Sequence, residues 1–97
     1  MRNGMRPIHP GEILREEFLL PYEMSGSALA QALRVPANRI NGILNGARAV
    51  TADTALRLAR YFNTTPELWM NLQKTYELRV AEREVGARIR REVKPAA

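Results

Sequence analysis

The 97-residue sequence contains no cysteine and only one histidine, His9. Without cysteine the chain can form neither a disulfide bond nor a thiolate metal site. His9 has no second imidazole with which to share a metal ion, so we expect it to cap a helix or to pack. We therefore expect no metal and no other cofactor.

Long apolar runs are also absent. No stretch approaches the roughly 18 consecutive apolar residues of a membrane-spanning helix, and the N-terminus lacks the apolar core of a signal peptide. We expect a soluble, cytoplasmic chain with no membrane partner.

Converging catalytic groups are missing as well. The carboxylates are scattered over polar faces, whereas acid–base catalysis needs several titratable groups in one pocket. This argues against a hydrolase or a metal enzyme, and we expect no enzymatic activity and no small-molecule substrate. An RNA-binding module is disfavoured because the sequence shows neither a sheet with aromatic platforms nor a clamp motif.

What the sequence has is positive charge in the form of arginine. Fifteen basic residues oppose ten acidic ones, and Lys74 and Lys94 are the only lysines. This balance favours a polyanionic partner, and the planar guanidinium suits phosphate. At 45% apolar, the chain is long enough for one core,. We expect one domain over 1–97, with a flexible basic arm at 1–8 carrying Arg2 and Arg6.

The segment 27–44 has the pattern of two short helices joined by a tight turn. Leu29, Ala30 and Leu33 recur at helical spacing in the first helix, and Pro36 suits the start of the second. Arg34 occupies the turn position that usually holds glycine. If Arg34 is left-handed, it costs about 1 kcal/mol relative to glycine, and it can offset part of that cost by touching phosphate.

The second of these helices carries three asparagines. At about 100° per residue, Asn38, Asn41 and Asn45 share one face, opposite Ile40 and Ile43. Asparagine is a mediocre helix former, but its amide can form paired hydrogen bonds with an adenine edge in the major groove of DNA. The pattern therefore predicts a helix-turn-helix whose second helix reads DNA.

Residues that flank the two helices suit contacts with the DNA backbone. Ser25 or Ser27 can cap the first helix of the helix-turn-helix, and helix N-termini also bind phosphate. Gly46 is suited to end the second helix, which places Arg48 beside the groove.

The remaining sequence predicts three further helices, so the expected fold is all-α with five helices. The first begins at His9-Pro10-Gly11-Glu12 and ends at Pro21, the fourth begins after Thr51, and the last covers 66–93. In the last helix, Trp69, Leu72, Tyr76 and Val80 share a face that closes the core. A second apolar stripe lies opposite and predicts a partner surface, unless the helix breaks at Gly86; it consists of Leu78, Val85, Ile89 and Val93,.

From Met5 to Arg79 the sequence resembles the HigA-type antitoxins, which belong to the Xre-like (lambda-repressor-like) helix-turn-helix class. The segments that carry the resemblance are MRPIHPGEILREEFL and TADTALRLARYFNTTPELWMNLQKTYELR, on either side of the helix-turn-helix.

The resemblance implies a lambda-repressor-like fold and a homodimer. It also implies an antitoxin that neutralises a HigB-type toxin, an mRNA endonuclease of RelE-like fold, and represses its own operon by binding double-stranded operator DNA. By position, it implies base reading by Asn38, Arg39, Asn41 and Asn45. It implies contacts with the DNA backbone by Ser25, Ser27 and Arg48. Arg34, in the turn between the two helices, is a further expected contact with the DNA backbone.

One alternative stays open. A stand-alone Xre-family transcriptional regulator would have the same fold without a toxin partner. The second stripe of the last helix would then serve dimerisation alone, whereas an antitoxin uses it for either a dimer or a toxin.

Overall fold

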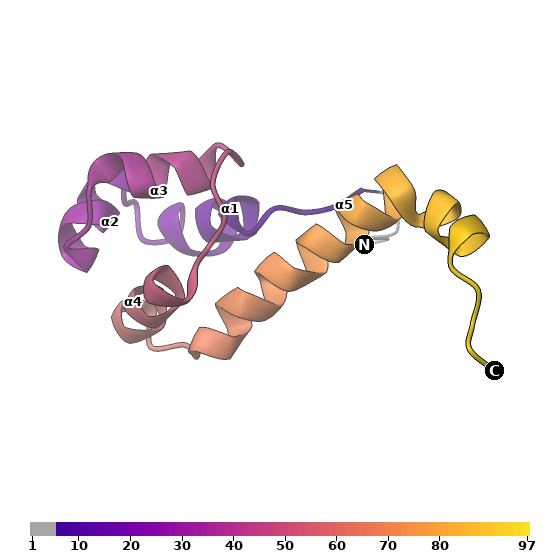
Figure 1. The fold of residues 1–97 in the computed structure, drawn as a ribbon. Helices are drawn as coiled ribbons and strands as arrows, with labels where there is room; N and C mark the ends of the chain where they lie inside the picture. The colour runs from indigo at the N-terminus through magenta and orange to yellow at the C-terminus, as the bar shows by residue number, and fades with distance from the viewer. Residues whose placement is uncertain (1–5) are drawn as a thin grey trace.

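A computed structural model describes residues 6–97, and all of its regular structure is helical (Figure 1). The predicted five-helix, all-α fold is confirmed. The first helix is divided into an α-helical turn and a π-helical continuation. The elements in chain order are α1 (Pro10–Ile13), η2 (Leu14–Leu19), α2 (Gly26–Leu33), α3 (Ala37–Leu44), α4 (Ala52–Phe62) and α5 (Pro66–Glu92).

Short polar side chains fix where the helices begin. The His9 Nδ1 atom accepts a hydrogen bond from the Gly11 N–H at 2.9 Å, so the single histidine caps α1. Ser25 Oγ accepts from the Ala28 N–H at 3.0 Å, which makes Ser25, and not Ser27, the cap of α2. Thr65 caps α5 in the same way. Each cap satisfies a backbone N–H that the helix itself leaves free.

Left-handed residues end the helices. Arg34, in the turn after α2, has φ 62° and ψ 43° and is therefore left-handed. The next N–H, that of Val35, then closes back on the Ala30 carbonyl at 3.0 Å. Gly46, with φ 76°, ends α3 in the same manner, because the Ala47 N–H reaches the Gly42 carbonyl at 2.9 Å,.

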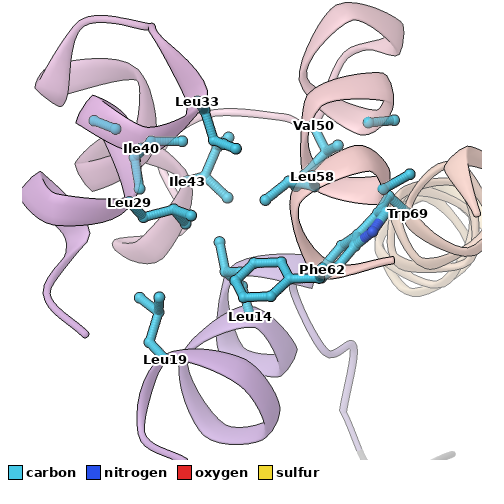
Figure 2. Close-up of a cluster of buried hydrophobic side chains, with 13 residues drawn as sticks. Leu14, Leu19, Leu29, Leu33, Ile40, Ile43, Val50, Leu58, Phe62 and Trp69 are labelled. Carbon is cyan, nitrogen blue, oxygen red and sulfur yellow. The ribbon is translucent and has the colours of Figure 1, made fainter. Parts of the chain in front are cut away.

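The core lies where α1, η2, α2, α3 and α4 meet the first half of α5 (Figure 2). Trp69 is fully buried, and its indole N–H donates to Thr64 Oγ1 at 2.9 Å. Gln73 is also buried, and it accepts the Val50 N–H at 2.8 Å, which fastens the segment between α3 and α4 to α5. The buried hydrophobic residues that form the core are Leu14, Leu19, Leu29, Ala30, Leu33, Ile40, Ile43, Val50, Ala55, Leu58, Ala59, Phe62 and Trp69.

The second half of α5 extends beyond this core (Figure 1). A helix of 27 residues is about 40 Å long,, and the molecule measures 50 × 24 × 22 Å. Its radius of gyration is 15.8 Å, against about 13 Å for a compact domain of this length,. α5 continues through Gly86, so the predicted alternative of a break at this glycine is wrong.

The N-terminal arm was expected to carry two arginines, Arg2 and Arg6, of which the structure describes only Arg6. Arg2 lies outside the described residues. Arg6 is described, and its guanidinium forms two hydrogen bonds with the Glu12 carboxylate, at 3.0 and 2.8 Å.

Candidate nucleic-acid interface

α2 and α3 form the predicted helix-turn-helix, and small residues let them approach closely. Ala30 is 2% exposed between them, and Ile40 and Ile43 are fully buried. A methyl group at Gly26 would lie 2.6 Å from Asn41 Oδ1 and 2.8 Å from Leu44 Cδ1. The start of α2 is therefore in contact with the side chains of α3.

The polar face of α3 is open to solvent. Asn38, Asn41 and Asn45 are all exposed, and within residues 6–97 none of their amides forms a side-chain hydrogen bond. The Asn41 amide oxygen lies against Gly26, which places it beside the N-terminus of α2. The face therefore presents amide donors and acceptors that no other group of the described chain uses.

Arg48 is held close to this face by the turn that follows α3. Its own N–H donates to the Gly42 carbonyl at 3.1 Å. A methyl group at Gly42 would lie 3.2 Å from Arg48 Cβ and 3.4 Å from Arg48 Cδ, so the aliphatic stem lies along α3. The guanidinium is exposed at the end of that stem.

His9 supports the same turn from the side of α1. Its ring lies 3.9 Å from the position of a methyl group on Gly46. Burial lowers the pKa of His9 from its usual value, and a hydrogen bond to the Arg48 backbone offsets part of that shift. The neutral ring thus links the start of α1 with the loop that carries Arg48.

Arg39 lies apart from the asparagines, on the flank of α3 that faces α4. Its NH1 atom donates to Asp53 Oδ2 at 2.6 Å, and the same oxygen accepts from Arg57 Nε at 2.9 Å. Arg57 in turn donates from NH1 to the Leu33 carbonyl at the end of α2, at 2.9 Å. Hydrogen bonds from Arg57 and then Arg39 lower the pKa of Asp53, so this carboxylate is ionised at neutral pH.

Sequence reasoning missed Asp53 and Arg57 as parts of the site. Asp53 stands 14 residues after Arg39, and Arg57 stands 24 residues after Leu33. Helical periodicity gives no signal for such pairs, because it reports only the face that a residue occupies on its own helix.

The residues predicted to contact the DNA backbone lie in two places. Ser25 and Ser27 are exposed at the N-terminus of α2, next to Asn41. Arg34 is exposed at the opposite end of α2, about 12 Å away along an eight-residue helix,. Only Ser25 also has a capping role, because its Oγ already accepts the Ala28 N–H.

Two other kinds of site are absent from the described residues. No group of three or more His, Asp or Glu side chains there is arranged to hold a metal ion. None of the helices in this part of the chain combines the length and the apolar character needed to cross a membrane.

The fold and this exposed helix define a helix-turn-helix DNA-binding protein. The helix-turn-helix family profile matches residues 14–69 of the chain. Virulence-associated protein I of Dichelobacter nodosus is 53% identical over 83 residues, which cover 86% of this chain and 77% of that protein.

Solved structures narrow the class. The structure of Pseudomonas aeruginosa antitoxin HigA with the higBA promoter is 49% identical, with a TM-score of 0.93 over 95% of this chain and all of that one. An addiction module antidote protein of the HigA family from Coxiella burnetii is 56% identical, with a TM-score of 0.90 over 94% of this chain and 99% of that one. The chain belongs to the HigA-type antitoxins of the Xre-like helix-turn-helix class.

Membership of this family confirms one prediction made from the sequence, that the chain is not an enzyme. The relatives are helix-turn-helix regulators and antitoxins and not enzymes.

Proposed function

We propose that this chain is an autorepressing antitoxin that binds operator DNA as a homodimer and neutralises a HigB-type toxin by direct contact. The observation that carries the DNA part is the open face of α3, with three exposed amides that no group of the described chain engages. A related structure is that of the Pseudomonas aeruginosa antitoxin HigA with the higBA promoter, which supports the two roles together.

In this proposal α3 enters the major groove and reads bases. Asn38, Asn41 and Asn45 present amides, each suited to a bidentate contact with adenine. Arg39 extends the reading surface from the flank, held by Asp53.

The backbone contacts lie on either side of the reading face. Ser25 and Ser27 lie at the positive end of the α2 dipole, where backbone N–H groups favour a phosphate. Arg48 and Arg34 add exposed guanidiniums at the end of α3 and at the turn. Such contacts position the protein on DNA without specifying its sequence.

The partner surface lies on the part of α5 that leaves the core. Leu78 is 65% exposed, Ile89 46% and Val93 64%, and a helix with two apolar faces requires two partners. Leu78 also borders two hollows of about 540 and 240 Å³ along α5. The proposed dimer or toxin surface comprises Leu78, Val85, Ile89 and Val93.

One stripe on α5 also suffices for dimerisation alone, and this favours a second candidate, a stand-alone Xre-family regulator without a toxin. The two candidates share the DNA-binding mechanism. They differ only in whether the apolar stripe, or another surface, also binds a toxin.

Titration of fluorescent DNA tests the shared mechanism. The duplex covers the region upstream of the operon that contains this protein's gene, and the control duplex has the same length and base composition in shuffled order. The proposal predicts binding to the first duplex at least about a thousandfold tighter than to the second at physiological salt. Equal affinity for both would contradict sequence-specific repression.

Co-purification tests the toxin. The chain is expressed with its genomic neighbours and captured by an affinity tag. A small basic ribonuclease-like protein recovered at fixed stoichiometry supports the antitoxin. Recovery of the chain alone, still binding its own promoter, contradicts toxin binding and leaves the stand-alone regulator as the account.

A further inference from the structure

A single carboxylate joins the reading helix to the helix behind it. Asp53 lies in the first turn of α4, with its side chain 55% exposed, and its Oδ2 atom binds Arg39 of α3 and Arg57 of its own helix. Arg57 is itself bound to the Leu33 carbonyl of α2. All three helices around the turn therefore meet at one charged group.

We propose that Asp53 is a positioning residue that sets the DNA sequence specificity of α3 by holding the Arg39 guanidinium in one place. This inference rests on the proposed function, because it assumes that α3 reads operator DNA.

The chemistry of arginine supports the proposal. A guanidinium has five N–H donors in a planar fork, and the hydrogen bond to Asp53 uses one donor of the Arg39 NH1 group. Free donors of a guanidinium held in this way can meet a base edge in a fixed geometry. An unrestrained arginine at the same position would pair with whichever phosphate lies nearest, and phosphate contacts carry no sequence information.

The position of the Asp53 carboxylate does not depend on Arg39 alone. Arg57 holds the carboxylate from the α4 side at 2.9 Å and is fixed by its bond to Leu33 at 2.9 Å. The carboxylate therefore stays at the flank of α3 when DNA approaches.

The variant Asp53→Asn removes the charge while keeping a residue of the same size in the first turn of α4. Operator DNA is selected from a random duplex library with the wild-type protein, and a shuffled duplex is the non-specific probe. For Asp53→Asn, the ratio of operator affinity to shuffled-duplex affinity should fall about tenfold, as expected for loss of one well-oriented base contact. The salt slope on the shuffled duplex should steepen by about one unit, because another arginine becomes available to phosphate.

A double-mutant cycle separates positioning from a general effect of charge. In an Arg39→Ala background, Asp53→Asn should leave the affinity ratio unchanged, because the group that Asp53 positions is gone. Glu67→Gln is the matched control, since Glu67 lies in the first turn of α5 and its loss changes the net charge equally. This control should alter neither the ratio nor the slope.

Two results would overturn the inference. One is an affinity ratio in Asp53→Asn equal to wild type. The other is an equal fall in the wild-type and Arg39→Ala backgrounds, which would mean that Asp53 acts on DNA through its charge alone. Both leave the proposed function intact, whereas failure of the library selection to enrich any sequence with wild-type protein would contradict the proposed function itself.

Discussion

At the scale of single residues, Arg34 is under backbone strain. It holds φ 62° after α2, in a region where a side chain with Cβ costs about 1 kcal/mol relative to glycine,. Arg34→Gly should therefore raise the free energy of unfolding by about 1 kcal/mol, seen as a higher melting temperature. Asn63→Gly is the control, because Asn63 has φ 58° but asparagine tolerates this region, so its gain should be smaller,. A lower melting temperature for Arg34→Gly would contradict the account.

His9 gives the protein a pH dependence of stability. Burial lowers its pKa from the usual value of 6.5, so the unfolded chain binds a proton more readily than the folded chain does. The contribution of His9 is complete above about pH 6.5 and is lost as the pH falls below it, because protonation removes the Nδ1 acceptor that caps α1,. The melting temperature should fall between about pH 7.5 and about 5.5.

The variant His9→Asn isolates this effect. Asparagine caps a helix well and does not titrate, so the melting temperature of this variant should be nearly flat over the same range. Glu12 and Asp53 do not interfere, since their usual values of 4.5 and 3.8 are lowered further and they lose their contribution only in stronger acid. If the melting temperature depends on pH equally in wild type and variant, a group other than His9 causes the pH dependence.

Single residues also show how much of the structure can be predicted from the sequence alone. The left-handed Arg34 was predictable because it occupies a turn between two periodic segments just before Val35-Pro36. The pairing of Arg39 with Asp53 was not, because it depends on how α4 lies against α3. Leu56 is a large apolar residue of α4, yet it is 59% exposed, so hydrophobicity alone does not define a buried face.

At the scale of elements, the contact between α1 and α3 depends on Gly11. A methyl group there would lie 1.9 Å from the Ile43 carbonyl oxygen and 2.7 Å from its carbon, and both are backbone atoms that cannot rotate away. Gly11→Ala should lower the free energy of unfolding by about 3 kcal/mol or more, measured by urea denaturation.

Gly86→Ala is the matched control in α5. Its added methyl group would meet the Glu82 carboxylate at 2.6 Å, the far end of an exposed side chain that can move. Stability should change little or rise by up to about 1 kcal/mol through helix propensity. Equal losses for the two glycines would show that neither contact controls stability.

Most element boundaries were predictable because caps and proline signals are local. The exception is η2, whose π-helical hydrogen bonds include Leu20 N–H to the Arg15 carbonyl at 3.0 Å. Nothing in LREEFL distinguishes this segment from an ordinary α-helix, and the structure supplies no physical reason for it.

At the scale of the whole molecule, the exposed stripe of α5 should control self-association or toxin binding. Ile89→Asp should weaken homodimerisation, or toxin binding if the stripe serves that role, by at least about tenfold, since it places a charge where an apolar side chain would be buried. Size-exclusion chromatography with light scattering measures the dimer. Circular dichroism should show an unchanged helical fold, because Ile89 lies outside the core.

Ala87→Asp is the control for this variant. Ala87 is exposed on the same helix but outside the stripe, so the same added charge should leave association unchanged. If Ile89→Asp unfolds the monomer, or if both variants behave like wild type, the stripe is not the partner surface.

The central claim is that the amide face of α3 reads DNA sequence, and the most direct test is the affinity ratio between operator and shuffled duplex for Asn41→Ala. The account predicts a loss of roughly 1–3 kcal/mol in operator binding with little change on the shuffled duplex. Arg48→Ala should instead weaken both duplexes and make the salt slope shallower by about one unit. An unchanged ratio for Asn41→Ala would contradict the claim that this residue reads a base.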